Sequence, residues 1–285
     1  MKKYVFASLG KLESLGIRIG GAGLGNMLFT WAKSIVYAKN NNLIFIPPTW
    51  SSLKIGPMLR GEFDKRLYNN LFKNDHSFSV FKKFLVLNFK RKEVQVFQGM
   101  EGLFSDFLNE HHFIKTKLLD ITGEEHLKNI KDFTGDGISI HIRMGDFYPF
   151  TNEKELREGK WNTQLPLKWY ISQIEKIRNE TNKDIPVYIF SDATDEELLK
   201  VLELPNTHRE FFGSAIADML ALSKSKVLIA SGSTFSSWAS FLGQNHTIWF
   251  PGQQRMRLVE SDEKFDGELD YDTPVPSFIK GEFDV

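Results

Sequence analysis

The 285-residue sequence contains no cysteine, which excludes disulfide bonds, thiolate catalysis and cysteine-ligated zinc. Its 41% hydrophobic and 25% charged residues are ordinary for a globular protein and exclude extended disorder, coiled coils and collagen-like repeats. The formal net charge is zero, but residues 1–135 carry 20 Lys/Arg against 12 Asp/Glu and residues 136–285 carry 16 against 24, which indicates two regions with different partners.

Both β-strands and α-helices are expected along the chain. Apolar runs that end at glycine, proline or polar residues are typical of buried strands, and apolar residues three or four positions apart are typical of helices. Strands are expected at residues 17–20, 43–46, 94–97, 138–142, 187–190, 227–230 and, as the last one, 247–250. Helices are expected to begin after Gly25, at Pro166, at Asp195, near Ala217 and after Ser231-Gly232-Ser233-Thr234.

Alternating strands and helices predict parallel sheets and an α/β fold. The charge reverses near Thr134-Gly135-Asp136-Gly137, so we expect one domain at 1–135 and another at 136–285. Ligands of parallel sheets bind outside the carboxyl ends of the strands. Four segments of this sequence place glycine or polar residues at such ends.

The first segment is Gly20-Gly21-Ala22-Gly23-Leu24-Gly25-Asn26, between an expected strand and an expected helix. Glycine lets the backbone approach an anion, and a helix N-terminus offers N–H groups to it. The spacing is neither that of a dinucleotide-binding fingerprint nor that of a P-loop. A tight strand-to-helix turn explains the segment equally well.

The second segment is His141-Ile142-Arg143-Met144-Gly145-Asp146. Strand alternation places Ile138, Ile140 and Ile142 on one face, and His141 and Arg143 on the other. The guanidinium of an arginine at a strand end has donors that suit a phosphate. A structural ion pair of Arg143 with Asp146 or Asp192 is the alternative.

The other two segments combine carboxylates with small hydroxyl residues. Asp192 follows a buried strand, where it either caps the next helix or binds a ligand, and capping is the commoner role. Ser231-Gly232-Ser233-Thr234 leads into a helix, and hydroxyl residues there serve as N-caps or bind phosphate. Asp218 lies one element earlier and is expected near the same sheet edge.

The sequence does not support other catalytic or metal-binding motifs. His111-His112 has no partner at metal-ligand spacing, and no G-x-S-x-G elbow indicates a serine nucleophile. Asp270-Tyr271-Asp272 has the D-x-D form of some metal-using glycosyltransferases, but we interpret it as part of a solvated acidic tail. We therefore expect neither a metal site nor a cofactor.

Five segments in a fixed order resemble one known family. They are GLGNMLF at 23–29 with Ala32, HIRMGDF at 141–147, PLKWY at 166–170, IFSD at 189–192, and DMLALS at 218–223 with IASGSTFSSW at 229–238. They resemble the patterns G-L-G-N-Q-[ML]-F-x-Y-A, H-x-R-R-G-D-[YF], P-x-x-Y-Y, F-S-D, and D-[LM]-x-L-M-S with I-x-[AS]-N-S-[ST]-F-S-W-W. These are motifs of the bacterial α-1,2-fucosyltransferases, glycosyltransferase family eleven.

The sequence departs from these motifs at four positions. Met27 replaces a glutamine, Met144 the second arginine of the H-x-R-R motif, Gly232 an asparagine and Ser237 the first tryptophan of a pair. The arginine that the family shares with α-1,6- and protein O-fucosyltransferases is retained as Arg143. The departures put the donor and the linkage in question, and residues 50–135 match no motif.

The resemblance implies a GT-B-like architecture of two Rossmann-like domains, with GDP-fucose held mainly by the C-terminal one. It implies an inverting, metal-independent fucosyltransferase in surface polysaccharide synthesis, acting on galactose. Carried over by motif, Arg143 contacts the β-phosphate and stabilises the GDP leaving group. The other donor-binding residues are then Gly25 and Asn26 in the N-terminal domain, His141 and Asp218 at the guanine nucleotide, and Ser233, Thr234 and Phe235 at the pyrophosphate.

The acceptor hydroxyl also needs a base, for which Asp146 and Glu153 follow the arginine motif. Asp146 has the alternative role of holding Arg143 in place. Two other functions stay open: a related transferase for another nucleotide sugar, and a glycan- or nucleotide-binding protein without turnover.

The basic N-terminal domain is expected to face the glycan acceptor, on a lipid-linked carrier in our hypothesis. Lys82, Lys83, Lys90, Arg91 and Lys92 stand among phenylalanines, a pattern of proteins that contact nucleic acid or anionic membranes. No nucleic-acid motif accompanies them, so we expect the membrane. No run of about 18 apolar residues exists, and the first apolar run breaks at Gly10-Lys11. We therefore expect a cytoplasmic protein at the inner face of the membrane.

Overall fold

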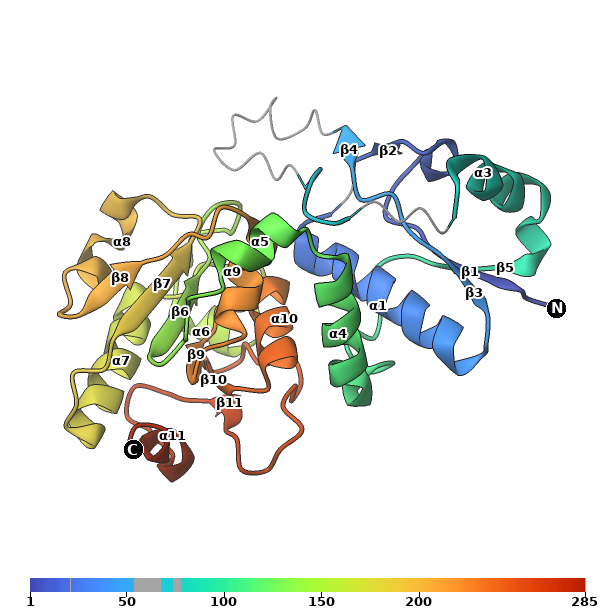
Figure 1. The fold of residues 1–285 in the computed structure, drawn as a ribbon. Helices are drawn as coiled ribbons and strands as arrows, with labels where there is room; N and C mark the ends of the chain where they lie inside the picture. Colours follow the sequence, from blue (N-terminus) through green and yellow to red (C-terminus); the bar gives the residue numbers. More distant parts are fainter. Residues whose placement is uncertain (21, 54–67, 74–77, 285) are drawn as a thin grey trace. The chain divides into compact units, whose positions relative to one another are not determined.

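The computed structural model describes residues 1–20, 22–53, 68–73 and 78–284, and the chain divides into two compact units, Met1–Leu127 and Lys128–Val285. Each unit is built on a parallel β-sheet with helices packed against it (Figure 1). The predicted α/β class, with two units and mainly parallel sheets, is confirmed. The division lies shortly before the reversal of charge in the sequence.

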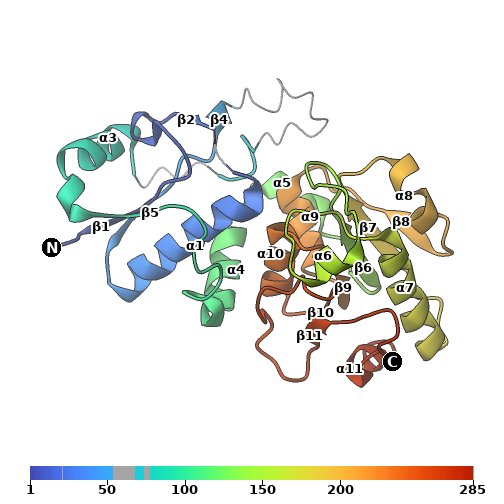
Figure 2. The ribbon, with the colours of Figure 1, turned by 180° about the vertical axis from the view of Figure 1, so that it is seen from behind.

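The sheet of unit 1 has three parallel strands in the order β3-β1-β5: β1 (Tyr4–Ala7), β3 (Ile44–Ile46) and β5 (Val94–Phe97). Helix α1 (Leu24–Asn40) lies on one face and α3 (Val80–Phe89) on the other (Figures 1 and 2). Phe78 and Val86 pack there against Phe6, Ile46 and Val94. The remaining elements of this unit are η1 (Glu13–Leu15), β2 (Arg18–Ile19), β4 (Ser52–Leu53), η2 (Arg91–Glu93), η3 (Leu108–Glu110), α4 (His111–Ile121) and α5 (Glu124–Asn129), which continues into unit 2.

The expected strand at 17–20 is present, but it lies outside the main sheet of unit 1. Its central part is β2, which pairs with β4 in a separate two-stranded sheet. Arg18 is fully buried and donates to the carbonyl oxygens of Thr49 (2.8 Å) and Trp50 (2.5 Å), while Ile17 and Ile19 are about half exposed. In this strand the arginine side chain therefore points inward and the two isoleucine side chains point outward. The arginine can be buried because main-chain acceptors satisfy its guanidinium. The main sheet uses β1 instead, which the sequence pattern did not reveal as a strand.

The sheet of unit 2 has six parallel strands in the order β11-β10-β9-β6-β7-β8. They are β6 (Ile138–Ile142), β7 (Val187–Ser191), β8 (Thr207–Arg209), β9 (Val227–Ile229), β10 (His246–Trp249) and β11 (Asp266–Glu268). The helices are α6 (Glu153–Arg157), α7 (Leu167–Thr181), α8 (Asp195–Leu202), α9 (Ala215–Leu222), α10 (Thr234–Gly243) and α11 (Ser277–Gly281).

The strand order makes unit 2 a doubly wound sheet. The chain proceeds from β6 through β7 to one edge, then returns to β9 beside β6 and continues to the other edge. The direction of winding therefore reverses between β6 and β9, and a crevice forms outside the carboxyl ends of strands at such a point. Ile138, Ile140 and Ile142 of β6 face the core that Trp169 and Ile174 of α7 complete.

The acidic C-terminal segment is folded, which corrects its interpretation as a solvated tail. β10 is not the last strand, since β11 pairs with it in parallel. Trp169 Nε1 donates to the carbonyl oxygen of Leu269 at 2.9 Å, and Lys176 Nζ to that of Asp270 at 2.6 Å. The apolar residues of this segment, widely spaced among charges, are part of the unit 2 core: Leu269, Val275, Ile279 and Phe283.

We predict that Ile279→Ala destabilises the protein by about 2–4 kcal/mol, because the fully buried side chain leaves a cavity in the core. Urea unfolding followed by circular dichroism measures the change. Phe278→Ala is the matched control on the same helix: its ring is 52% exposed, and a change of about 0.5 kcal/mol or less is expected. Equal effects of the two substitutions would contradict the docking of this segment.

Candidate functional site

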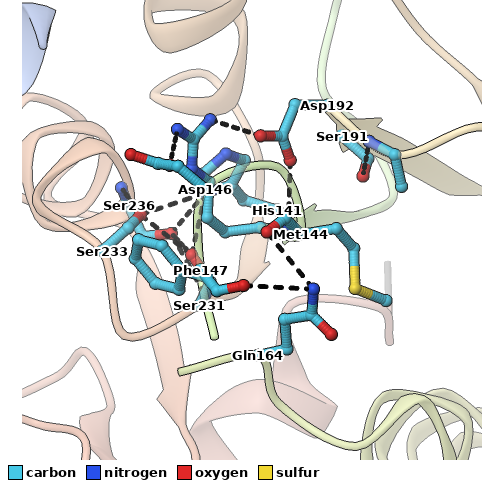
Figure 3. A network of polar contacts seen from close by, with 12 residues as sticks. His141, Met144, Asp146, Phe147, Gln164, Ser191, Asp192, Ser231, Ser233 and Ser236 are labelled. Carbon is cyan, nitrogen blue, oxygen red and sulfur yellow. Dashed lines mark hydrogen bonds and ion pairs between the residues drawn. The ribbon is translucent and has the colours of Figure 1, made fainter. Parts of the chain in front are cut away.

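Two loops of unit 2 meet at the point where the winding reverses. Residues 143–146 follow β6, and residues 230–233 follow β9, its neighbour in the sheet. Both loops lie at carboxyl ends of parallel strands, where ligands of such sheets bind. The predicted segments around Arg143 and Ser233 are therefore brought to one place in unit 2 (Figure 3).

His141, at the end of β6, forms the centre of a hydroxyl cluster (Figure 3). Its Nδ1 atom lies 2.8 Å from Ser236 Oγ, 3.0 Å from Ser231 Oγ and 3.4 Å from Ser233 Oγ. The three serines also contact one another, and the Ser231 N–H donates to Ser236 Oγ at 3.1 Å. The cluster ties the end of β6 to the first turn of α10.

Burial keeps the His141 imidazole neutral. Only 6% of the residue is exposed, and burial together with the nearby Arg143 charge lowers its pKa to about 3. The imidazole ring lies against the Phe235 ring, with 4.8 Å between the centroids and an angle of 32° between the ring planes. At neutral pH this imidazole can donate one hydrogen bond and accept another, but it carries no charge.

Helix α10 directs its N-terminus at the same loops. Ser233 is its N-cap, and Ser233 Oγ accepts from the Ser236 N–H at 3.2 Å. Thr234 and Phe235 are the first two residues of the helix. The end of the helix dipole and its N–H groups give this turn a positive potential that suits an anion.

Arg143 is held between two carboxylates. Nη1 lies 2.6 Å from Asp192 Oδ2, and Nη2 lies 2.5 Å from Asp146 Oδ1. The Asp192 side chain is 14% exposed and that of Asp146 is 45% exposed. The guanidinium also lies over the Phe147 ring, 5.7 Å from its centroid. Both ion pairs that the sequence offered as alternatives for Arg143 are formed.

Asp192 does not cap the next helix, which corrects the sequence-based preference. The N-cap of α8 is Thr194, whose side chain forms a capping box with Glu197. Asp192 Oδ1 instead accepts from the Met144 N–H at 2.8 Å (Figure 3). Gly145 permits this contact, because a Cβ atom there would lie 2.1 Å from Asp192 Oδ2.

The remaining predicted site residues of unit 2 lie on α9 and α6. Asp218 is in the first turn of α9, and its Oδ1 accepts from the Phe212 N–H at 2.7 Å. Burial raises the pKa of Asp218 to about 7, against the effect of that hydrogen bond. Its carboxylate is therefore partly protonated near neutral pH.

Glu153 is the first residue of α6 and belongs to a separate ionic network. Glu153 Oε1 lies 2.6 Å from Lys168 Nζ and accepts from the Tyr271 hydroxyl at 3.0 Å, and Arg157 forms a two-bond pair with Asp270. Burial acts to raise the pKa of Glu153, but the bonds from Lys168 and Tyr271 and the charge of Arg157 outweigh it and lower the pKa. Asp270, which the D-x-D pattern singled out, thus has a structural partner.

Gly25 and Asn26 belong to unit 1. They are the second and third residues of α1, after the N-cap Gly23. Gly21 of the same glycine-rich segment lies outside the described residues. The predicted turn from strand to helix is present, although the strand before it is β2 of the small sheet.

Three of the departures from the family motifs lie in closely packed surroundings, and at Gly232 the packing explains the replacement. The side chain of Met144 belongs to the unit 2 core. Met27 is 2% exposed, and its Sδ lies 3.1 Å from Arg18 Nη1. At Gly232 a Cβ atom would lie 2.3 Å from Oε1 of Gln253, whose Nε2 donates to the Leu156 carbonyl oxygen at 2.7 Å. The Gln253 amide thus occupies the space beside Gly232 that an asparagine side chain would need.

At the fourth departure, Ser237 Oγ donates to the Ser233 carbonyl oxygen at 3.1 Å. Nothing in the structure explains why a tryptophan is absent there.

A comparison with family models finds one match, to glycosyl transferase family 11, over residues 95–257. The matched region is more than half of the chain and contains every predicted site residue of unit 2. The chain belongs to glycosyl transferase family 11. The family predicted from the motifs is thereby confirmed, and the protein is a glycosyltransferase.

Solved structures that resemble this chain include those of NodZ and POFUT1. NodZ α-1,6-fucosyltransferase, co-crystallised with GDP, is 12% identical with a TM-score of 0.44 over 88% of this chain and 95% of that chain. Another NodZ structure, from Bradyrhizobium, is 12% identical over the same shares, with a TM-score of 0.43. POFUT1 in complex with GDP-fucose is 15% identical with a TM-score of 0.36 over 87% of this chain and 73% of that chain. A comparison with curated protein sequences finds no match.

Two further features concern the described part of this family 11 chain. None of its helices is both long and apolar enough to cross a membrane. Residues 1–20, 22–53, 68–73 and 78–284 contain no group of three or more His, Cys, Asp or Glu side chains that could hold a metal ion.

Sequence reasoning missed several residues that shape the site. Gln164 Nε2 donates to the carbonyl oxygens of Met144 and Phe147, both at 3.3 Å (Figure 3). These bonds hold the loop of residues 143–147, which we call the arginine loop. Gln253 and the hydrogen bonds of Ser236 to His141 were also not foreseen. No local pattern marks these residues, because their partners are 17 to 97 positions away in the sequence.

We predict that Gly145→Ala destabilises the protein by about 1–3 kcal/mol, because the new methyl group displaces Asp192 from Arg143 and from the Met144 N–H. Thermal or urea unfolding measures the change. Gly281→Ala is the matched control, since nothing lies within 4 Å of a Cβ atom at that position. If both variants were as stable as the wild type, the tight contact between Gly145 and Asp192 would be wrong.

Proposed function

We propose that the protein transfers fucose from GDP-fucose to a hydroxyl of a glycan acceptor, with inversion at the sugar C1 and without a metal ion. The proposed linkage is α-1,2 to galactose, in the synthesis of a surface polysaccharide. Membership of family 11 supports the reaction class. The observation that carries the proposal is Arg143, which stands at the reversal point of a doubly wound sheet beside the N-terminus of α10.

The donor would bind at the carboxyl ends of β6 and β9. Its pyrophosphate would meet the Arg143 guanidinium and the first turn of α10, where Ser233, Thr234 and Phe235 lie. Neutral His141 and the carboxylate of Asp218 would contact the guanine nucleotide, His141 as a hydrogen-bonding group and Asp218 as an acceptor for N–H groups. Gly25 and Asn26 are retained as donor-binding residues on the strength of the family motif.

In the proposed reaction the acceptor oxygen attacks C1 of fucose on the side opposite to the pyrophosphate. The C1–oxygen bond to the β-phosphate breaks as the new glycosidic bond forms, and GDP leaves with the electron pair. Arg143 and the helix N-terminus stabilise the negative charge that develops on the β-phosphate. The acceptor hydroxyl gives its proton to a carboxylate.

Of the two predicted bases, Asp146 is the better placed. It lies directly beside Arg143, and its side chain is 45% exposed. Glu153 is bound to Lys168 and Tyr271, and its lowered pKa makes it a weaker base. We therefore assign the base to Asp146 and a structural role to Glu153.

We assign the glycan acceptor to unit 1, which carries the basic excess of the sequence. The proposed acceptor is linked to a lipid carrier, and the enzyme would work at an anionic membrane surface, at the inner face of the cytoplasmic membrane. No observation favours another nucleotide sugar over GDP-fucose, so that alternative enters as an outcome of the test.

We expect both GDP and GDP-fucose to bind in calorimetric titrations. EDTA should leave the affinity for each of them unchanged. Arg143→Ala should weaken binding by about tenfold to a hundredfold, because a charge-assisted contact to phosphate is lost. Since burial places the pKa of Asp218 near 7, acidification below pH 7 should weaken GDP binding, and Asp218→Asn should flatten this dependence.

Arg157→Ala is the matched control for Arg143→Ala, because its guanidinium is also paired with a carboxylate but belongs to the network around Asp270. GDP binding of this control should equal that of the wild type. Selective binding of UDP-glucose or GDP-mannose would overturn the donor assignment. A strict metal requirement would overturn the metal-independent mechanism.

We predict that Asp146→Asn lowers kcat for fucose transfer at least a hundredfold while changing the affinity for GDP less than fivefold. Glu153→Gln should leave kcat within about tenfold of the wild type. Initial rates with GDP-fucose and galactosides, measured from pH 5 to 9, provide the comparison. A large loss of kcat confined to the Glu153 variant would reverse the assignment of the base.

A further inference from the structure

Helix α3 presents apolar side chains on its outer side. Phe81, Leu85 and Phe89 are spaced four residues apart, so they form one stripe along the helix. They are 71%, 38% and 75% exposed. A surface helix of a soluble protein normally has charged or polar residues in this stripe.

The inner side of α3 shows that this orientation is built into the fold. Lys83 is 5% exposed, and its Nζ donates to the Pro47 carbonyl oxygen and to Thr49 Oγ1, both at 2.9 Å. Burial lowers the pKa of Lys83 to about 8, while the charge of Glu13 acts in the opposite direction. Val86 packs beside it in the core. The helix thus directs a lysine inward and phenylalanines outward.

The neighbouring loop extends the apolar surface. Gly16 lies against Val80, because a Cβ atom on Gly16 would be 2.9 Å from Val80 Cγ1. Val80 is 58% exposed, and the loop residues on either side of Gly16 are about half exposed. We call the whole surface the α3 face, and it consists of Leu12, Leu15, Ile17, Val80, Phe81, Leu85 and Phe89.

The exposed charges in this part of unit 1 are almost all positive. Among the described residues up to 98 the acidic ones are Glu13, which is buried, and Glu93, which pairs with Lys3 at 3.3 Å. The exposed basic residues on α3, just after it and on the loop packed beside it are Lys11, Lys82, Lys90, Arg91 and Lys92. An exposed apolar patch with such neighbours marks an interaction site.

We propose that the α3 face docks the protein on an anionic membrane, with Phe81, Leu85 and Phe89 inserted at the level of the lipid headgroups. Lys82, Lys90, Arg91 and Lys92 would contact the headgroup phosphates. This assigns a surface to the membrane contact of the proposed function. The sequence pattern predicts a part for Lys83 as well, and its burial excludes it.

The composition of the face favours a membrane over a protein partner. Aromatic and aliphatic side chains beside lysine and arginine are the pattern of helices that lie in a membrane interface. Each basic residue near an anionic bilayer adds attraction that salt screens, and each buried apolar side chain adds attraction that salt does not screen. Binding should therefore have a salt-sensitive part and a salt-resistant part.

The test is co-sedimentation of the 285-residue chain with vesicles of phosphatidylcholine alone and with vesicles that also contain about 30% phosphatidylglycerol, whose negative surface attracts basic residues. We expect binding to the anionic vesicles only. Phe81→Ser with Phe89→Ser should weaken it at least tenfold. Lys90→Gln, Arg91→Gln and Lys92→Gln together should weaken it about a hundredfold at low salt.

Two matched controls remove the same chemistry elsewhere. Phe278→Ser deletes an exposed phenylalanine from unit 2, and Lys117→Gln, Lys128→Gln and Lys131→Gln remove three exposed positive charges from other parts of the chain. Both controls should bind vesicles as the wild type does. Circular dichroism verifies that every variant is folded.

Three results would overturn the proposal: no binding of the wild type to anionic vesicles, binding that the α3 variants leave unchanged, or a wild-type dimer in sedimentation velocity that Phe81→Ser with Phe89→Ser converts to a monomer. The last result would assign the face to a second copy of the chain. GDP titration of the same samples keeps the two proposals apart, because donor binding does not depend on vesicles.

Discussion

Two carboxylates hold Arg143 in place, and the proposed donor site depends on this arrangement, because an arginine that is to receive a pyrophosphate must be positioned before the anion arrives. The pairs differ in exposure: Asp192 is largely buried, whereas Asp146 reaches solvent. An exposed ion pair is weak and exchanges readily, and a buried one is costly to break. Asp192 therefore fixes the guanidinium, while in the proposed function Asp146 can yield its place to a phosphate. The same arrangement needs a glycine at 145, because any side chain would enter the space of Asp192.

The neutrality of His141 complements this charge. A protonated imidazole beside Arg143 would repel it in a region with little water, and burial prevents that protonation. The cluster of serines around the ring then joins β6 to α10, so the arginine loop and the helix N-terminus form one rigid surface. Within residues 143–147 and 230–236, which the structure describes, positive potential comes from the Arg143 side chain and the N-terminus of α10. The proposed chemistry needs no more than this, since the leaving group is a diphosphate.

Unit 1 uses its charges differently. Three of its buried ionic groups, Arg18, Glu13 and Lys83, are satisfied largely by main-chain groups and hold loops against the small sheet. Because these groups occupy the interior positions, apolar residues of the same segments are left outside. The orientation of α3 about its axis thus accounts both for its exposed apolar face and for the buried lysine beneath it.

Local sequence determined much of unit 2: the strands β6, β7 and β9, the helices α7 to α10, and the motif residues that are typical of family 11. These features could be predicted because apolar spacing and capping act over a few residues. The strands β1 and β11, the role of Asp192 and the fit of Gln253 against Gly232 were decided by tertiary structure, since the contacts that define them join distant segments. The same holds for the orientation of β2 and α3: a pattern of alternation shows which residues share a face but not which face is buried. Whether an arginine or a lysine can be the buried one depends on carbonyl groups that only the folded chain brings within reach.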